Sequence, residues 1–464
     1  MRIKKVMNPS LRISALHHET LREHLFPGDG LEAVAFAICG RRRAEGGDIL
    51  TLQRVMPVPY DMCVRSENRV TWRTEAIVSL LDEVKGQGLA IVKFHSHSSA
   101  YEEFSLWDDE TDRETFASVF AWLDEVELHG SAVMLPDGRI FGRSVTEDDW
   151  QPFSVITVVG DNLFYWYPED VAESSLAAFE AQDQLFGAGT TARLRKLRVG
   201  VVGCSGTGSI VIELLARLGV GKLVLIDDEY IEDRNLNRIL NAKQSDVGQP
   251  KVSVLAEAVR QMGLGAEILP LEMNLYDPKA VLGVAECDVV FGCMDTAEGR
   301  HILNRIATFY LVPYFDLGVH LAADANDGIN EASGVVHYLQ PGRSSLLSRK
   351  AYTMDQVRAE GASRTDPATY EEWREVNYIE GVDEKSPAVV SVNAMIASLA
   401  VNEFLARLHP FRSCENNECA IVRFNFMETL IAQEQETKIR DKVLARHVGK
   451  GDIEPLLEWS SLSK

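Results

Sequence analysis

Apolar residues in the first part of the chain form short runs that alternate with two longer stretches of helical periodicity. The longer stretches predict one helix over Trp72–Lys85 and a second from Leu106 to about Glu127. The second helix carries one apolar face, made by Phe116, Val119, Phe120 and Leu123. The short runs predict strands at Ala33–Cys39, Ile49–Val55, Leu89–Phe94 and Ser131–Leu135. Together these elements predict a compact α+β domain over residues 1–150.

A different rhythm begins near residue 199, where buried strands alternate with helices. Strands are expected at Val199–Val202, Leu223–Ile226 and Val289–Phe291, with helices at Ser209–Leu218 and Ser391–Leu405. This alternation predicts an α/β domain with a doubly wound, mainly parallel, Rossmann-like sheet over residues 191–445. Residues 151–190 are expected to form a connector with its own helix, Glu169–Gln184, and residues 446–464 a polar tail.

Length, net charge and cysteine content limit the class of protein and its expected location. A length of 464 residues suggests two or three domains. A net charge of −22 argues against a nucleic-acid partner, which would require clustered Lys and Arg. The longest apolar stretch, Ala388–Leu399, is too short to span a bilayer, and no signal peptide is evident. Because the seven cysteines follow no disulfide pattern, we expect a cytoplasmic protein.

The first chemical motif is His95-Ser96-His97 followed by Ser105 and Asp108. It offers two imidazole nitrogens and one carboxylate after a predicted strand, which matches a zinc site with three protein ligands and an open fourth position. Each fragment alone has an ordinary explanation. Ser105 and Asp108 suit a helix capping box, and exposed histidine pairs are common in loops. Their combination at this spacing favours a metal site.

This spacing resembles the JAMM (JAB/MPN) metalloproteases, whose isopeptidase members cut ubiquitin-like proteins from lysines. The resemblance implies that zinc is held by His95, His97 and Asp108. It also implies that Glu32, just before an apolar strand, is the general base and that Ser105 donates a hydrogen bond to the tetrahedral oxyanion. The family usually has proline after the second histidine. This chain has Ser98, which affects the loop and not the ligands.

The second motif is a glycine-rich turn between a strand and a helix, containing Gly203, Gly206 and Gly208. Such turns let backbone N–H groups approach a phosphate. A nicotinamide dinucleotide site is an alternative, but its fingerprint G-x-G-x-x-G requires glycine where this chain has Ser205. The next strand ends in Asp227, a carboxylate suited to ribose hydroxyls.

Further polar motifs follow in order, containing Asn235, Arg238, Lys251 and Asp295. Over roughly residues 175–430 the ordered set resembles the ThiF-type adenylyltransferases, which include the ubiquitin-activating enzymes. These proteins use ATP and Mg²⁺ to adenylate the C-terminal glycine of a ubiquitin-like β-grasp protein. The resemblance implies that Asp227 contacts ribose, that Asn235, Arg238 and Lys251 bind phosphates, and that Asp295 binds magnesium.

The chain departs from that family at three places. The stretch 180–187 lacks the arginine that reaches a neighbouring subunit's ATP; Arg193 or Arg195 could substitute. The paired Cys-x-x-Cys motifs are missing, so we expect no structural zinc in the second domain. No cysteine occurs from 294 to 413, where activating enzymes form a thioester. The candidate acyl acceptors are Ser345, Ser348 and Cys414, although ordinary loop positions explain the two serines better than an acceptor role does.

The two resemblances together imply a fusion of the kind encoded in bacterial operons for ubiquitin-like conjugation. One half would mature or remove a ubiquitin-like protein, and the other would adenylate it for a conjugating enzyme, because both sites must accept the same extended tail. A homodimer through the adenylation domain is also implied. Two alternatives stay open: activation of a sulfur carrier for cofactor biosynthesis, and a partner-binding scaffold with one inactive site.

Overall fold

The computed structural model describes residues 9–123, 127–169, 176–323, 328–368, 370–371, 388–437 and 439–462. The chain forms two compact units. Unit 1 contains Met1–Asp170 together with Phe309–Leu311 and His447–Glu454. Unit 2 contains Val171–Thr308, Val312–Arg446 and Pro455–Lys464.

Unit 1 is built on a mixed nine-stranded sheet with the strand order β11-β10-β1-β3-β2-β6-β7-β8-β9. Its central strands pair antiparallel where β2 meets β3 and β6, and in parallel where β6 meets β7. The strands are β1 (Ser10–Ser14), β2 (Val34–Arg42), β3 (Ile49–Pro57), β6 (Ala90–Ser96), β7 (His129–Met134), β8 (Ile140–Val145), β9 (Trp150–Pro152), β10 (Ile156–Val159) and β11 (Leu163–Trp166). A separate hairpin joins β4 (Cys63–Ser66) to β5 (Arg69–Trp72).

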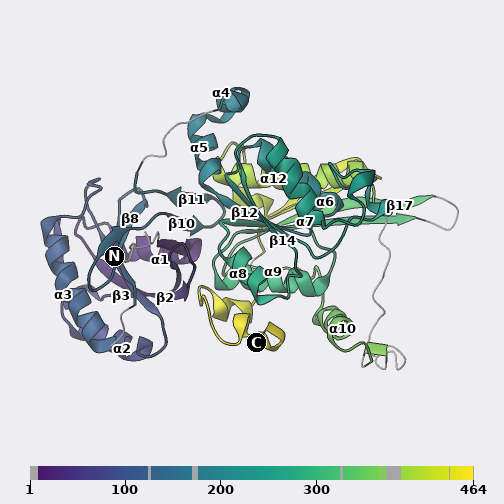
Figure 1. Ribbon diagram of the computed structural model, residues 1–464. Helices are drawn as coiled ribbons and strands as arrows, with labels where there is room; N and C mark the ends of the chain where they lie inside the picture. Colours follow the sequence, from purple (N-terminus) through teal and green to yellow (C-terminus); the bar gives the residue numbers. More distant parts are fainter. Residues whose placement is uncertain are drawn as a thin grey trace, which may run out of the picture. The chain divides into compact units, whose positions relative to one another are not determined.

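Helices cover both faces of this sheet (Figure 1). The alternation along β2 explains how: its small residues Ala35 and Ala37 share one core with α1 (Ala15–Leu25), whereas Phe36 and Ile38 share the other core with α2 and α3. The helix α2 spans Glu75–Val84, and α3 spans Leu106–Leu123. Because β2 and β6 are buried along their whole length, this sheet gives a rigid base to the residues at their ends.

The strands predicted in unit 1 are confirmed, with shifts of at most three residues at their ends. The helix expected from Trp72 begins later, because Arg69–Trp72 forms β5. The sheet also continues past residue 150, where the sequence placed the end of the first domain: β10 pairs in parallel with β1, and β11 pairs with β10. Part of the helix expected at Glu169–Gln184, residues 170–175, lies outside the described residues; the described part contains α4 (Glu180–Phe186).

The C-terminal segment His447–Glu454 belongs to unit 1 and is not a free tail. Gly449 O accepts hydrogen bonds from Gly40 N at 3.2 Å and Thr51 Oγ1 at 2.8 Å. At Gly451 a Cβ would lie 2.4 Å from the backbone nitrogen of Arg41. The polar composition of this segment gave no sign of such packing, because its contacts are made by the backbone.

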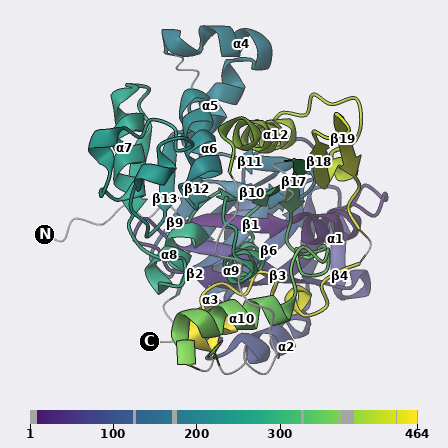
Figure 2. The same ribbon diagram turned by 90° about the vertical axis from the view of Figure 1, so that its right-hand side faces the viewer.

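Unit 2 is built on an eight-stranded sheet with the strand order β14-β13-β12-β15-β16-β17-β18-β19. Among the described strands the first four pairs are parallel and the last three antiparallel, so the sheet is mixed. Figure 2 shows the β18–β19 hairpin at the antiparallel edge. The strands are β12 (Arg198–Val202), β13 (Lys222–Ile226), β14 (Glu267–Leu271), β15 (Val289–Gly292), β16 (Tyr314–Ala323), β17 (Ile329–Leu339), β18 (Ile421–Asn425) and β19 (Leu430–Glu434).

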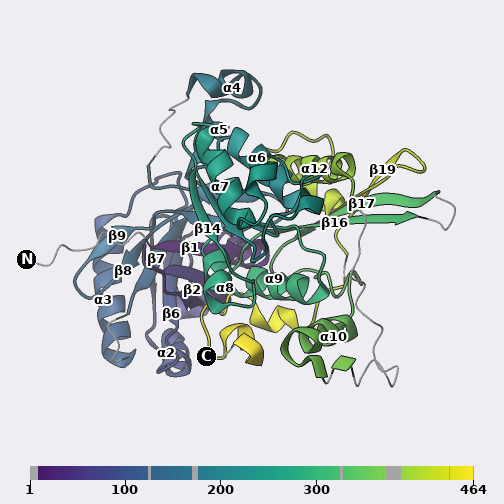
Figure 3. The same ribbon diagram turned by 45° about the vertical axis from the view of Figure 1, so that its right-hand side comes forward.

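Helices also flank this second sheet on both faces. Figure 3 shows α6, α7 and α12 on one face and α8 and α9 on the other. The α-helices of unit 2 whose bounds lie within the described residues are α4, α5 (Ala188–Lys196), α6 (Gly206–Arg217), α7 (Lys251–Gln261), α8 (Pro278–Ala285), α9 (Ala297–Phe309), α10 (Met354–Thr365) and α12 (Val390–Leu408). The Rossmann-like arrangement predicted from the alternating pattern is therefore confirmed. Within the described ranges, no helix has the length and apolar character needed to cross a membrane.

Candidate functional sites

The predicted zinc ligands of unit 1 lie together. His95 is near the end of β6, His97 follows that strand directly, and Asp108 lies in the first turn of α3. Their side-chain ligand atoms all lie within 4.8 Å of one another. Nε2 of His95 is 3.0 Å from Oδ1 of Asp108, and Nε2 of His97 is 3.4 Å from Oδ2. All three residues are buried.

The hydrogen bonds around these residues fit a metal site. Both ring nitrogens of the buried His95 lack a hydrogen-bond partner among the described residues, which is costly unless another group satisfies them. The ring of His97 is oriented by a 2.8 Å hydrogen bond between Nδ1 and the carbonyl of Tyr101, which leaves Nε2 directed at Asp108. Two imidazole nitrogens and one carboxylate form a donor set that zinc accepts.

The surroundings of the site also shift the pKa values of its titratable groups. Burial lowers the pKa of His95. Burial also opposes ionisation of Asp108 and His97, but the imidazoles of His95 and His97 beside the Asp108 carboxylate outweigh it and lower the pKa of Asp108. That carboxylate and the carbonyl of Tyr101 raise the pKa of His97. Glu32 lies beside these residues, and burial raises the pKa of its carboxyl group to about 7. Such shifts are common where buried groups are gathered for chemistry.

Strand pairing carries Glu32 to this site. Residue Val34 pairs with His95 across the β2–β6 ladder, and Ser96 Oγ accepts the N–H of Ala33 at 2.9 Å. Ser105 joins the site from the start of α3, where its hydroxyl donates to Oδ2 of Asp108 at 2.7 Å. The Asp108 N–H in turn donates to Ser105 Oγ at 3.1 Å. Ser105 therefore caps helix α3 and at the same time contacts the predicted zinc ligand Asp108. The contribution of Ser105 to an oxyanion site stays a prediction.

Unit 2 contains a cavity of about 1010 Å³ at the carboxyl ends of its parallel strands. It gathers residues from five of the predicted motifs. Seven of the eight predicted nucleotide-binding residues line it: Gly203, Gly206, Asp227, Asn235, Arg238, Lys251 and Asp295. The volume is large enough for a nucleotide and an extended peptide end.

The glycine-rich turn has separate structural reasons for each glycine. Gly203 has a φ of +89°, a region that favours glycine. At Gly208 a Cβ would lie 1.8 Å from the carbonyl oxygen of Gly203, so this residue permits close packing and does not itself line the cavity. Helix α6 begins at Gly206 without a side-chain cap from Ser205. Its first N–H groups are therefore suited to bind a phosphate.

Asp227 and Lys251 are held at opposite ends of the next connection. Oδ2 of Asp227 accepts the N–H of Cys204 at 2.6 Å, and Oδ1 accepts the N–H of Glu229 at 2.8 Å. Burial raises the pKa of Asp227, against the nearby ammonium of Lys251. Lys251 is 2% exposed and forms an ion pair with Glu229, an acidic residue that sequence reasoning did not select.

The remaining predicted residues differ in how tightly they are held. Asn235 is buried, and its Oδ1 accepts the N–H of Glu232 at 2.9 Å. The guanidinium of Arg238 donates to the carbonyl of Arg234 at 2.6 Å. Asp295 is exposed in the loop between β15 and α9 and lines the cavity, where its carboxylate can coordinate a cation.

Several other residues that line the cavity were not predicted from the sequence, Arg300 and Asn393 among them. Arg300 lies on α9 one turn beyond the Asp295 loop, and its Nε is 3.2 Å from Oδ1 of the buried Asp316. The ion pair with Asp316 raises the pKa of Arg300. Its position one helical turn from a predicted ligand was an available signal. Asn393 comes from α12, which packs on α6, and no local pattern points to it.

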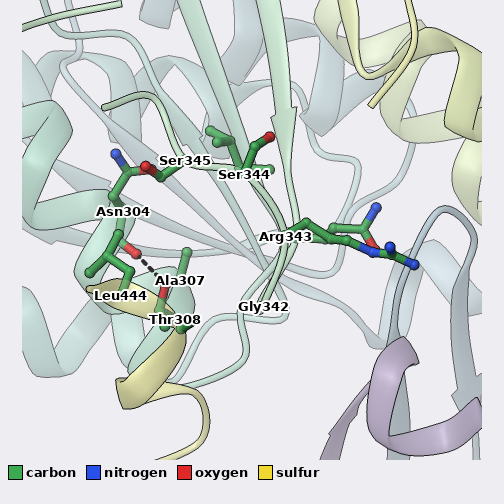
Figure 4. Close-up of a pocket in the computed structure, with 11 residues that line it drawn as sticks. Asn304, Ala307, Thr308, Gly342, Arg343, Ser344, Ser345 and Leu444 are labelled. Atoms are coloured by element: carbon green, nitrogen blue, oxygen red, sulfur yellow. Dashed lines mark hydrogen bonds between the residues drawn. The ribbon is translucent and has the colours of Figure 1, made fainter. Parts of the chain in front are cut away.

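The serines proposed as acyl acceptors lie elsewhere in unit 2. Ser345 lines a cavity of only about 10 Å³ (Figure 4), enough for one water at most. Its hydroxyl donates to Oδ2 of Asp441 at 2.6 Å and accepts the N–H of Ser348 at 3.1 Å. The Ser348 hydroxyl donates to the carbonyl of Ser345 at 3.1 Å. These bonds are those of an ordered turn, which matches the ordinary explanation for both residues.

The structure also places the other residues at which the chain departs from the ThiF-type pattern. Arg195 donates to the carbonyl of Leu264 at 3.1 Å, and neither it nor Arg193 lines the nucleotide cavity. The Sγ atoms of Cys414 and Cys419 lie 3.8 Å apart. Burial raises the pKa of the Cys419 thiol to about 11, which disfavours the reactive thiolate.

Unit 2 therefore has a nucleotide-type cavity on a Rossmann-like sheet. The sequence model of the ThiF family matches residues 179–442, and the chain belongs to that family. It is 36% identical over 121 residues to the SAMP-activating enzyme E1 of Haloferax volcanii, covering 26% of this chain and 45% of that protein. It is 31% identical over 111 residues to the adenylyltransferase and sulfurtransferase MOCS3 of Danio rerio, covering 24% of each.

The chain thus spans less than half the length of these curated relatives. Among solved structures, it is similar to Escherichia coli MccB with ATP, with a TM-score of 0.44 and 18% identity over 59% of this chain and 76% of that chain. The family match begins at residue 179 and leaves out nearly all of unit 1, so the metalloprotease assignment made from the sequence stays a prediction.

Proposed function

We propose that the chain is a bifunctional enzyme of a ubiquitin-like protein pathway. Unit 2 adenylates the C-terminal glycine of a β-grasp protein with ATP and Mg²⁺, and unit 1 is a zinc-dependent peptidase or isopeptidase acting on the same protein. The adenylate then passes to a conjugating enzyme. The adenylation half rests chiefly on one observation: seven residues predicted from separate motifs line a single cavity.

The chemistry of that cavity suits adenylate formation. The reaction joins a carboxylate to the α-phosphate of ATP and releases pyrophosphate, so negative charge must be neutralised. Arg234, Arg238, Lys251 and Arg300 supply four cationic side chains around the cavity. Asp227 would accept hydrogen bonds from ribose, and Asp295 would hold magnesium. The names of the two relatives, an activating enzyme and an adenylyltransferase, support the same reaction.

An ATP–pyrophosphate exchange assay tests this half. The β-grasp partner would first be captured by pull-down with the Lys251→Ala variant. With that partner, wild type should exchange label, and Lys251→Ala should lower the rate by ~10²-fold or more because the phosphate loses its buried cation. Lys279→Ala, which removes an exposed lysine outside the cavity, is the matched control. Equal exchange by both variants would contradict the assignment.

The peptidase half rests on the cluster of His95, His97 and Asp108. These side chains would hold zinc, which when bound polarises a carbonyl oxygen and lowers the pKa of a coordinated water. Glu32 would take the proton from the attacking water, since its buried carboxylate lies beside the ligands. Ser105 would reorient its hydroxyl from Asp108 toward the developing oxyanion.

A second candidate for unit 2 is activation of a sulfur carrier. Two observations favour it: the similarity to MOCS3, which is named as a sulfurtransferase as well as an adenylyltransferase, and the lack of cysteine from 294 to 413. Both routes begin with the same adenylate. Co-purification of a sulfurtransferase, in place of a conjugating enzyme, would favour the sulfur carrier. Exchange activity with any β-grasp partner would exclude a purely scaffolding role for unit 2.

The assembly and setting follow the family resemblance. We propose a homodimer through the adenylation domain in a cytoplasmic setting. Because stretch 180–187 supplies no arginine for a neighbouring subunit's ATP, the dimer should not be needed for nucleotide binding. Sedimentation of the purified chain with and without ATP measures this: a monomer that still exchanges pyrophosphate would show that pairing is dispensable.

A further inference from the structure

The β4–β5 hairpin contacts every segment that carries the proposed metal site. The backbone N–H of Glu32 donates to the carbonyl of Ser66 at 2.8 Å. After the histidines, the hydroxyl of Ser98 donates to the carbonyl of Glu67 at the hairpin turn. At the start of α3, the guanidinium of Arg69 lies 3.3 Å from the ring centre of Trp107, next to Asp108.

Arg65 makes the densest of these contacts. Its Nε donates to the carbonyl of Glu32 at 2.8 Å, and its Nη2 donates to the carbonyl of Leu31 at 2.9 Å. The two terminal nitrogens also bind the carboxylate of Asp29, at 2.8 and 3.1 Å. Asp29 closes the turn by accepting the N–H of Leu31 at 3.0 Å. One guanidinium therefore fixes four acceptor atoms in residues 29–32.

The geometry of arginine is required for this arrangement. A planar guanidinium can bind a carboxylate with two parallel N–H groups and still direct other N–H groups at neighbouring carbonyls, whereas an ammonium acts as a point charge. The Arg65 side chain is 9% exposed and lies 4.3 Å from the ring centre of Tyr60. Its bonds to the backbone are thus shielded from water.

The hairpin itself is anchored to the core. Val70 is buried in the core shared by α2 and α3, and Trp72 meets Phe36 edge to face at 5.6 Å between ring centres. Phe36 lies on β2, the strand that Glu32 precedes. The hairpin therefore contacts β2 through Trp72, and it contacts the residues just before β2 through Arg65.

We propose that Arg65 is a positioning residue that fixes the backbone of Glu32 relative to the metal ligands, with the β4–β5 hairpin as its frame. The inference rests on the proposed peptidase function but concerns residues that touch neither zinc nor substrate. Loss of Arg65 should displace Glu32 while leaving His95, His97 and Asp108 in place, since the hydrogen bonds of Arg65 go to residues 29, 31 and 32.

The test compares Arg65→Ala, Arg65→Lys and the control Arg54→Ala in the full chain. Arg54 is a half-exposed arginine of β3 that pairs with Glu83, away from these contacts. Amide hydrogen exchange is measured over residues 29–34, and zinc affinity by competition with a chromophoric chelator. Steady-state kinetics use a fluorogenic peptide amide ending in Gly-Gly.

Arg65→Ala should speed exchange of the 31–34 amides by ~10-fold or more, with zinc affinity changed by less than about 3-fold. It should lower kcat by ~10–100-fold with little change in KM, because the base is misplaced and substrate contacts are kept. Arg65→Lys should restore only part of kcat, and Arg54→Ala should match wild type.

Two results would overturn the positioning role: unchanged exchange at 31–34 in Arg65→Ala, or exchange that rises across the whole unit together with loss of zinc. If wild type with bound zinc does not hydrolyse the probe or any β-grasp precursor, the peptidase proposal fails. The exchange measurement still decides the role of Arg65 in that case.

Discussion

Nε2 of His95 and Oδ1 of Asp108 lie 3.0 Å apart, although they come from a strand and a helix and are thirteen positions apart in the chain. The two atoms do not meet hydrogen-bond geometry, and the ring nitrogens of His95 have no other hydrogen-bond partner among the described residues. A cation bound between them would satisfy the imidazole and neutralise the carboxylate. The approach of these two residues is the main structural support for a metal in unit 1.

Replacing Asp108 should remove that metal. Asp108→Asn supplies one neutral oxygen in place of a carboxylate, so zinc affinity should fall by at least ~100-fold. Mass spectrometry of the purified protein should find roughly one zinc per wild-type chain and almost none in the variant. Glu110→Gln changes an exposed acidic residue two positions along α3 and should keep its zinc. Equal zinc in wild type and Asp108→Asn would rule out this ligand set.

Buried His129 should make unit 1 sensitive to acid. Its Nδ1 accepts the N–H of Ile91 at 3.0 Å, and burial lowers its pKa to about 3. In the unfolded chain His129 has an ordinary histidine pKa of about 6.5. Between that pH and about 3 it is therefore protonated in the unfolded chain but neutral in the folded chain. Stability from this group is therefore complete above about pH 6.5 and falls as the pH drops toward 3, at up to about 1.4 kcal/mol per pH unit.

Urea unfolding at pH 7, 6 and 5 measures this effect. His129→Gln can still accept the Ile91 N–H but cannot titrate, so its free energy of unfolding should fall less steeply with acid than that of wild type. His320→Gln, whose side chain is 68% exposed, is the control for the substitution itself. Identical slopes for His129→Gln and wild type would mean that His129 takes up its proton in the folded state.

The buried setting of Ser345 predicts a structural effect of its removal. Ser345→Ala takes a hydroxyl donor from Asp441 and should lower the free energy of unfolding by about 1 kcal/mol, without slowing pyrophosphate exchange. If either serine instead accepts the activated tail as an oxyester, the trapped conjugate will resist mild reductant and break in hydroxylamine. Loss of that conjugate in Ser345→Ala or Ser348→Ala would assign it, whereas cleavage by reductant would exclude both.

Much of each site could be predicted because its residues belong to short motifs at strand ends. His95 and His97 follow a continuous apolar run, and Asp227 ends another, so the strand pattern places them at the edge of a sheet. Asn235, Arg238 and Lys251 lie within one connection, and their order could be recognised without knowing the fold.

Contacts between distant segments could not be predicted in this way. β1 pairs with β10 from 145 positions away, for instance Leu11 with Ile156, and both strands are too short to give a periodic signal. Arg65 bonds to the backbone of residues 31 and 32, which has no sequence signature. Asn393 reaches the nucleotide cavity only because α12 packs on α6. The local sequence pattern predicts which residues are buried and which segments are helices or strands. Contacts between distant segments depend on the tertiary fold.

Intact-mass spectrometry of a single reaction shows whether one chain both trims and adenylates the same β-grasp partner. The partner is supplied as a precursor with residues beyond its final glycine, together with zinc, ATP and Mg²⁺. Wild type should yield the trimmed protein and then its adenylate. Glu32→Gln should slow trimming by ~10²–10⁴-fold and give no adenylate from the precursor, yet adenylate a partner already ending in glycine. Full trimming by Glu32→Gln, or adenylation of the untrimmed precursor, would contradict the account.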